Sequence, residues 1–266
     1  GIVALMTLNI LKGFEFSERD SVETFHKQLE AMKLAYADGK KYIADPKSMN
    51  VNVSELLSDE YAAVRRKLIS TEAISPMPGK PPGGGTVYLA AADAEGNMVS
   101  YIQSNYMGFG SGIVIPNTGI SLHNRGCNFM LESDHANCLE PGKKPYHTII
   151  PGFLTREGKA VGPFGVMGTF MQPQGHVQVI MNAIDFHMNP QDCLDAPRWQ
   201  WISGKTIEVE QSFPQDIVKE LTARGHDMRV NEDTSSFGRG QIIWRLEDGT
   251  LAGGTEPRTD GMVAPW

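Results

Sequence analysis

The chain has 266 residues, of which 41% are hydrophobic and 21% charged, the composition of an ordinary globular protein with a sizeable core. Its net charge of −7 at pH 7 offers no basic surface to nucleic acid or to an anionic membrane. No apolar run approaches the roughly 18 residues that a membrane span requires, so neither a membrane span nor a nucleic-acid partner is expected.

The start of the chain and its cysteines bear on its origin. The segment from Gly1 to Met6 contains neither a start methionine nor a charged signal region, so we expect a fragment or a cleaved product. The three cysteines are odd in number and lack metal-ligand spacing, so we expect them to be reduced. A disulfide between Cys127 and Cys138 would form only in an oxidising compartment. The sequence does not determine the compartment, although a cytoplasmic location is favoured.

The first 80 residues are expected to be helical. An apolar stretch over residues 3–11 predicts one helix. Ser21 is placed to begin a second helix, and apolar residues follow it at helical spacing. That helix should end before Asp45-Pro46, because the residue before a proline is disfavoured in the α region. A shorter helix is expected over residues 53–68.

Residues 74–85 differ sharply in composition from the rest. Four prolines and four glycines fall in this stretch, which can support neither a helix nor a sheet ladder. We expect a mobile linker or an exposed processing site here, dividing the chain into residues 1–85 and 86–266.

Beyond the linker the pattern changes to short strands joined by turns. Residues 86–93 and 98–104 predict a hairpin, because an Ala-Glu-Gly-Asn turn separates them. Further strands are expected over 112–115, 119–122, 149–154, 160–164, 206–209, 228–230, 241–246 and 251–253, and further helices over 175–186, 190–196 and 214–224. Helices, antiparallel strands and helices again predict a layered α+β fold with helices outside a sheet sandwich.

Most standard catalytic motifs are absent from the sequence. There is no phosphate-binding P-loop, no GxGxxG, no HExxH and no GxSxG. The seven histidines show no paired ligand spacing. We therefore expect neither a metal site nor a cofactor.

One threonine occupies an unusual position. Thr86 follows the linker and begins the first predicted strand. If the peptide bond before it were cut, Thr86 would carry a hydroxyl and a free α-amine with a pKa near 8, which could take the hydroxyl proton. Nucleophile and base would then belong to one residue. The alternative from position alone is a threonine that simply starts a strand.

The residues around Thr86 resemble those of a known family. The segment from Thr86 to Asp93, followed by Glu95 to Ser100, resembles the start of the small subunit of γ-glutamyltransferases. Upstream, Gly1 to Leu11, Lys33 to Asp38 and Asp45-Pro46 resemble the end of the family's large subunit. The resemblance continues through Phe109 to Val114, Thr118 to Ile120, Asn128-Phe129, Lys144-Pro145, Ile150-Pro151, Asp195 to Arg198 and Glu256 to Arg258.

This resemblance implies a fold and a maturation reaction. The family makes a proenzyme that cuts itself before the matching threonine, and its fold is the four-layer αββα sandwich of N-terminal-nucleophile hydrolases. Residues 1–85 would then be the C-terminal part of the large subunit with the linker, and residues 86–266 the small subunit. The implied partners are a small-molecule amide substrate and the remainder of the large subunit, in a heterodimer of processed chains.

Catalytic roles can be carried over by position. Thr86 matches the nucleophile, and Ser104 matches a second hydroxyl that hydrogen-bonds to it. Gly168 and Thr169 match two glycines whose backbone N–H groups form the oxyanion hole. Thr169 replaces a glycine, so we expect a negative φ there, which a side chain tolerates.

The matching acyl pocket departs from the family pattern. Asn128 stands where the family has an acidic residue for the substrate ammonium, and Arg125 where it has a neutral or acidic one. His147-Thr148 match two serines that bind the substrate carboxylate, and Tyr106 matches an asparagine. The pocket has therefore lost an anion and gained a cation, unless Arg125 points elsewhere and pairs with a carboxylate.

The resemblance predicts a γ-glutamyltransferase-like amidohydrolase or acyltransferase that acts on γ-glutamyl amides such as glutathione. The altered pocket favours instead an acyl group with a carboxylate but no ammonium, as in the glutaryl substrates of the family's cephalosporin acylases. A third alternative is an inactive fragment or a binding module that has kept the fold.

Overall fold

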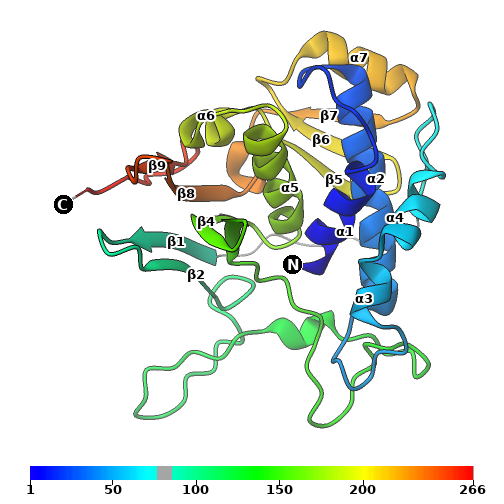
Figure 1. The fold of residues 1–266 in the computed structure, drawn as a ribbon. Helices are drawn as coiled ribbons and strands as arrows, with labels where there is room; N and C mark the ends of the chain where they lie inside the picture. The colour runs from blue at the N-terminus through cyan, green and yellow to red at the C-terminus, as the bar shows by residue number, and fades with distance from the viewer. Residues whose placement is uncertain (77–85, 266) are drawn as a thin grey trace.

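The computed structural model describes residues 1–76 and 86–265. The N-terminal part is helical, as expected, and its helices gather on one side of the molecule (Figure 1). These helices are α1 (Ile2–Leu11), α2 (Val22–Tyr42), α3 (Val53–Leu56) and α4 (Asp59–Arg66).

The helix boundaries follow local capping. The Ser21 side chain accepts a hydrogen bond from the backbone N–H of Thr24 and so caps α2, which ends before Asp45-Pro46 as predicted. The prediction of a single helix over residues 53–68 is wrong, because the segment forms two helices, α3 and α4. Ser58 lies outside both, and its side chain accepts a hydrogen bond from the backbone N–H of Tyr61. Because the Ser58 side chain caps the start of α4, α3 does not continue into α4.

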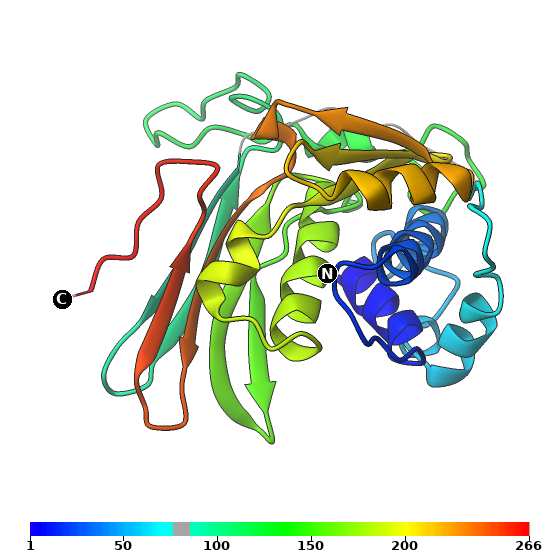
Figure 2. The same cartoon turned by 90° about the horizontal axis from the view of Figure 1, so that it is seen from above.

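Two sheets face each other in the C-terminal part. β1 (Thr86–Ala92) and β2 (Met98–Ser104) form an antiparallel hairpin with Thr86 opposite Ser104. The hairpin packs against a four-stranded sheet (Figure 2). Tyr88 lies directly over Gly165, where a β-carbon would come within 2.5 Å of its ring. The four strands, in the order β3-β4-β8-β9, are β3 (Gly152–Arg156), β4 (Lys159–Met167), β8 (Arg239–Arg245) and β9 (Leu251–Thr255).

Helices cover the other face of the four-stranded sheet. α5 (Met171–Ile184) packs on β4, and α6 (Pro190–Asp195) packs on β8 and β9. The helix expected from residue 175 begins four residues earlier, because Pro173 lies in the first turn, where a proline needs no N–H partner. The expected α+β class and sheet sandwich are confirmed.

A third sheet lies beside the N-terminal helices. Its strands are β5 (Trp199–Ser203), β6 (Thr206–Glu210) and β7 (Asp227–Asn231), and α7 (Gln215–Ala223) connects the parallel pair β6 and β7. The larger apolar core includes Phe25 and Met32 of α2 and Trp199 and Ile207 of this sheet. Strand β5 was not predicted, since three consecutive residues of it are buried and so it lacks the alternation of a half-buried strand.

Residues 112–122 contradict a second prediction. The strand pair expected there is reduced to one isolated bridge between Val114 and Ser121. Asn117 has a φ of 63°, and the N–H of Thr118 donates to the carbonyl of Ile115, which makes a tight turn. Backbone hydrogen bonds still pair the two segments, since the N–H of Ile115 donates to the carbonyl of Ile120 and the N–H of Leu122 to that of Ile113. Glycines with positive φ at Gly112 and Gly119 interrupt the extended conformation, so regular strands do not form.

Residues 77–85, most of the predicted linker, lie outside the described residues. None of the helices in residues 1–76 and 86–265 has both the length and the apolar character of a transmembrane segment.

Candidate active site

The hydroxyl of Thr86 faces that of Ser104. The β1–β2 register places the two residues opposite each other, and Thr86 Oγ1 donates to Ser104 Oγ at 2.9 Å. Ser104 Oγ also accepts the backbone N–H of Tyr106 at 2.9 Å. Thr86 is only 7% exposed, so its hydroxyl lies in a site largely removed from solvent.

Tyr106 connects this hydroxyl pair to the predicted acyl pocket. Its φ of 79° turns the chain sharply after β2, a conformation that costs free energy in a residue with a bulky side chain. The buried phenol donates to Asn128 Oδ1 at 2.9 Å, and Asn128 Nδ2 donates to the carbonyl of Tyr146. Burial raises the pKa of Tyr106, so the phenol keeps its proton as a donor.

Arg125 is buried beside Tyr106. It begins a 3-10 helix, Arg125–Asn128, and its guanidinium lies 5.0 Å from the centre of the Tyr106 ring. Nη1 donates to Thr148 Oγ1 at 2.8 Å, whereas Nη2 has no hydrogen-bond partner among the described residues. Burial is the main cause that lowers the pKa of Arg125, and no carboxylate is among the causes that act on it. A buried cation of this kind can bind an anionic ligand.

A cavity of about 480 Å³ adjoins these residues. His147, Thr148 and Thr169 line it together with His123, which the sequence reasoning did not single out. Burial first, and the charge of Arg125 second, lower the pKa of His147 to about 4, so its ring is neutral at pH 7. The N–H of Ile149 donates to His147 Nδ1 at 3.2 Å, which leaves the ring proton on Nε2.

Gly168 and Thr169 form the turn from β4 into α5. Gly168 has a φ of 133° and Thr169 a φ of 50°, so the negative φ expected at Thr169 is wrong. The chain reverses within this turn, since the N–H of Met171 already donates to the carbonyl of Gly168. Thr169 Oγ1 donates to the same carbonyl at 2.8 Å. No hydrogen bond between described residues uses the N–H groups of Gly168 and Thr169, so both remain available as donors.

Most of the predicted site residues thus meet in two connected groups. Hydrogen bonds join Thr86, Ser104, Tyr106 and Asn128, and Arg125 links Tyr106 to Thr148. His147, Thr148 and Thr169 share one cavity. Within the described part of the chain, no hydrogen bond connects Thr86 directly to Gly168 or Thr169.

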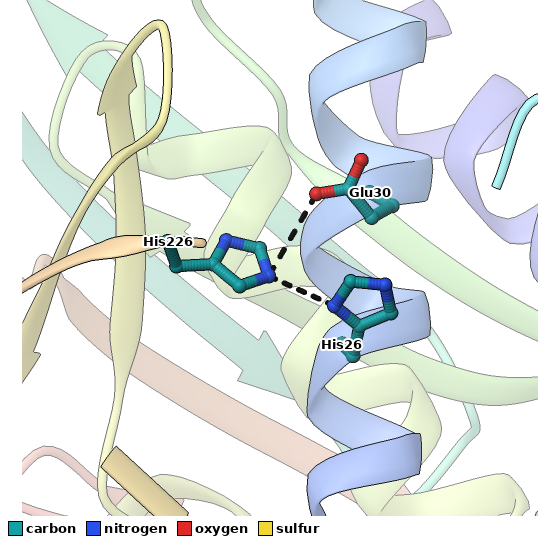
Figure 3. A group of neighbouring side chains, drawn as sticks. All are labelled: His26, Glu30 and His226. Atoms are coloured by element: carbon teal, nitrogen blue, oxygen red, sulfur yellow. Dashed lines mark hydrogen bonds and ion pairs between the residues drawn. The ribbon is translucent and has the colours of Figure 1, made fainter. Parts of the chain in front are cut away.

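A second polar cluster lies away from this site. Among the described residues, one group of three potential metal ligands is found: His26, Glu30 and His226, whose ligand atoms all lie within 4.8 Å of one another (Figure 3). However, the Lys33 ammonium lies 2.5 Å from Glu30 Oε1 and already neutralises the carboxylate. The site therefore lacks the free anionic ligand that would favour a divalent cation.

Comparisons with known proteins show that the chain is similar to hydrolase and acylase proenzymes. The family model described as gamma-glutamyltranspeptidase matches residues 1–266. The crystal structure of cephalosporin acylase from Bacillus halodurans matches all of this chain with a TM-score of 0.94 and 63% identity, over 49% of that protein.

Two curated relatives are also similar along nearly the whole chain. The glutathione hydrolase-like YwrD proenzyme of Bacillus subtilis (strain 168) is 36% identical over 273 residues, which cover 99% of this chain and 51% of the relative. The oxamate amidohydrolase proenzyme of Klebsiella pneumoniae is 34% identical over 270 residues, which cover 99% and 51%. The chain therefore spans about half the length of the curated relatives it matches.

Proposed function

Because this chain belongs to the γ-glutamyltranspeptidase family and has the N-terminal-nucleophile hydrolase fold, we propose that Thr86 becomes the nucleophile of an amidohydrolase after self-cleavage between Gly85 and Thr86. The observation that carries this proposal is the partly buried hydrogen bond between the hydroxyls of Thr86 and Ser104. This hydrogen bond orients the hydroxyl of Thr86, the residue that would gain a free α-amine on cleavage.

The proposed reaction uses the α-amine that cleavage would create at Thr86 and the backbone donors of the turn from β4 into α5. The free α-amine of Thr86 takes the proton from Oγ1, and the oxygen attacks the amide carbonyl to form a tetrahedral oxyanion. The N–H groups of Gly168 and Thr169 would stabilise this oxyanion, each contributing roughly 3 kcal/mol. The amine leaves with the proton held by the α-amine, and water or another amine then releases the acyl group from the Thr86 ester.

The acyl group that fits best carries a carboxylate without a neighbouring ammonium. Arg125 offers a buried guanidinium nitrogen with no partner among the described residues. A substrate ammonium would need an anionic side chain beside it, but Asn128 offers only a neutral amide. Glutaryl amides meet this requirement. γ-Glutamyl amides such as glutathione provide the carboxylate but also carry the neighbouring ammonium. Oxamate, named for one relative, likewise joins an amide to a carboxylate.

The hairpin also indicates a partner. Its outward face exposes the apolar side chains of Val87, Leu89, Val99 and Tyr101, each at least 43% exposed. Because the chain matches only half of each relative, we assign this face to the remainder of the large subunit. The mature protein would then be a heterodimer of processed chains.

Sequencing the processed chain tests the proposal. In the full-length protein, the smaller product should begin Thr-Val-Tyr-Leu, Thr86→Ala should remain a single chain without amidase activity, and Thr86→Ser should keep part of both reactions. Another starting residue, or full activity in Thr86→Ala, contradicts the nucleophile assignment. An unmodified protein that stays uncleaved and binds ligand without turnover supports the alternative of an inactive binding module.

A further inference from the structure

Phe170 directly follows Gly168-Thr169, the turn that carries the proposed oxyanion donors and that we call the oxyanion turn. Both turn residues have a positive φ, which costs free energy in Thr169 and persists only where the surrounding structure fixes it. Within the turn, the hydroxyl of Thr169 and the N–H of Met171 bond to the carbonyl of Gly168. Support from other elements of the fold reaches the turn through Phe170, at the start of α5.

The carbonyl of Phe170 accepts a hydrogen bond from the hydroxyl of Tyr36, a residue of α2. Tyr36 is 1% exposed, and burial raises the pKa of its phenol well above the ordinary value, so the hydroxyl keeps its proton and stays a donor. The side-chain amide of Gln174 donates to the same carbonyl at 3.1 Å. That amide also bonds to both backbone groups of Trp201. Two side chains that are themselves fixed therefore hold the Phe170 carbonyl.

The ring of Phe170 is held as well as its carbonyl. The ring of Tyr146 stacks on it, with the two centroids 6.3 Å apart and an angle of 7° between the planes. The Lys40 ammonium lies close to three ring centres, at 5.6 Å from Tyr36, 5.5 Å from Phe170 and 5.1 Å from Trp201. A cation near an aromatic face is attracted to it. Lys40 therefore draws α2, β5 and the start of α5 together.

These contacts connect the two parts of the chain that the proposed cleavage would separate. Tyr36 and Lys40 precede Thr86, whereas Phe170 follows it. Oxyanion donors act at roughly 2.7–3.1 Å from the developing charge, so even a small displacement of the turn weakens them. A hydrogen bond to the residue next to the turn has the direction that packing alone lacks.

We propose that Tyr36 is a positioning residue for the oxyanion turn, and that its hydrogen bond to Phe170 keeps the N–H groups of Gly168 and Thr169 directed at the tetrahedral intermediate. Lys40 supports the same arrangement through the ring of Phe170. This inference rests on the proposed function and deepens it, because a side chain upstream of the cleavage site would then control the chemistry of the downstream chain.

Tyr36 also lines the cavity beside Thr169, so the test separates positioning of the turn from contact with the substrate. It compares Tyr36→Phe with the unmodified protein, both full-length and matured, on the better of the glutaryl and γ-glutamyl anilides. The substitution removes one hydroxyl and keeps the ring, and the Gln174 amide still binds the Phe170 carbonyl.

We expect both kcat and kcat/KM to fall about fivefold in Tyr36→Phe. This fold-change corresponds to the loss of about 1 kcal/mol, the usual contribution of one hydrogen bond, at about 1.4 kcal/mol per tenfold in rate. KM should stay within about twofold, because donors that act on the oxyanion stabilise the transition state and not the bound substrate.

Two inhibitors with the same side chain give a second measurement. With 4-boronobutanoic acid, the hydroxyl oxygen of Thr86 bonds to boron while its proton passes to the α-amine, and the boron becomes a tetrahedral anion that resembles the intermediate. Glutaric acid binds without forming this bond. We expect Tyr36→Phe to raise the inhibition constant of the boronic acid by the factor that kcat loses and to leave that of glutaric acid unchanged.

Matched controls are available for both side chains. Tyr88 is also buried, but its hydroxyl bonds within the β1–β2 hairpin, so Tyr88→Phe should leave kcat unchanged. Lys40→Met removes the cation beside Phe170 and should lower kcat about twofold or more. Lys41, its neighbour on α2, lies over the ring of Tyr42 instead, so Lys41→Met should not change kcat.

An unchanged kcat in Tyr36→Phe, measured beside an active unmodified protein, would overturn the inference and leave the proposed function standing. A rise in KM alone would assign Tyr36 to substrate contact and would overturn it too. The same holds for an equal loss of kcat in Tyr88→Phe, which would indicate a general loss of structure. An unmodified protein that hydrolyses neither anilide contradicts the proposed function, and the inference falls with it.

Discussion

Ser104 holds two groups at the start of the hairpin. Its oxygen accepts hydrogen bonds from the hydroxyl of Thr86, the proposed nucleophile, and from the backbone N–H of Tyr106, so it orients that hydroxyl and supports the left-handed conformation of Tyr106. Ser104→Ala removes both bonds. Because each bond contributes about 1 kcal/mol and an unpaired buried N–H costs about 1–3 kcal/mol, we expect turnover of the mature protein to fall roughly 5- to 100-fold without loss of the fold.

The matched control is Ser100, on the same strand. Its hydroxyl bonds to that of Tyr88 rather than to Thr86, so Ser100→Ala should leave the rate constant for acyl transfer unchanged. Equal effects of the two substitutions would show that Ser104 is an ordinary strand residue.

In the proposed function, Arg125 and Asn128 would determine which acyl group the pocket accepts. A glutaryl carboxylate can bind the guanidinium through two hydrogen bonds, whereas the ammonium of a γ-glutamyl group would meet Arg125 as a like charge. The missing charged partner corresponds to about 1.5–3 kcal/mol. We therefore expect kcat/KM to be roughly tenfold or more higher for a glutaryl anilide than for the γ-glutamyl anilide.

The double variant Arg125→Gln with Asn128→Asp should reverse this preference. Aspartate at position 128 can still accept the hydroxyl of Tyr106, so the local hydrogen bond is retained. A butyryl anilide, which lacks the carboxylate, should respond little to the double substitution. Preference of the unmodified enzyme for the γ-glutamyl anilide would show that the pocket interpretation is wrong.

At the scale of an element, the turn from β4 into α5 carries backbone strain. Thr169 is β-branched and has a φ of 50°, a conformation that costs about 1–3 kcal/mol outside glycine. Its proposed role uses the backbone N–H, which glycine also has. We expect Thr169→Gly to raise the free energy of unfolding by roughly 1 kcal/mol, less any entropy that glycine adds to the unfolded chain, and to keep kcat within about threefold.

Denaturant unfolding and steady-state kinetics on the same preparation test this expectation. A large loss of kcat with an unchanged fold would mean that the hydroxyl of Thr169, which bonds to the carbonyl of Gly168, takes part in catalysis or holds the turn in its active form.

At the scale of the whole molecule, buried histidines make stability depend on pH. Burial lowers the pKa of His176 to about 4 and that of His226 to about 3, against 6.5 for an ordinary histidine. Between pH 6.5 and 4 the unfolded chain therefore binds more protons than the folded chain. The stability that these neutral rings contribute is present above pH 6.5 and is lost as the pH falls, at up to about 1.4 kcal/mol per pH unit for each histidine.

His176→Leu should flatten this profile, because it removes one of the buried rings. Unfolding free energies measured from pH 7 to pH 4 should show a shallower slope in the variant than in the unmodified protein. Identical slopes for His176→Leu and the unmodified protein would mean that His176 is protonated in the folded chain as readily as in the unfolded one.

Local patterns in the sequence were sufficient for much of the fold. The hairpin of β1 and β2 followed from strand residues on either side of a short turn, and the structure then supplied its register, with Thr86 opposite Ser104. The limits of α2 followed from Ser21 and Asp45-Pro46. In each case the deciding forces act between residues close together in the chain. The roles of Thr86, Ser104 and the acyl-pocket residues came from family resemblance and stay predictions.

Long-range packing decided the rest. Strand β5 exists because buried partners surround Trp199 and Trp201, and Thr169 takes a left-handed conformation because the chain must reverse between β4 and α5. His26 and His226, 200 residues apart, meet only in the folded protein. Whether a buried cation such as Arg125 faces a carboxylate or an open site depends on which segments surround it. The sequence by itself determined most of the helices and strands and, through the family resemblance, the candidate nucleophile. The tertiary structure decided which charges are paired, because pairing is a property of neighbours in space.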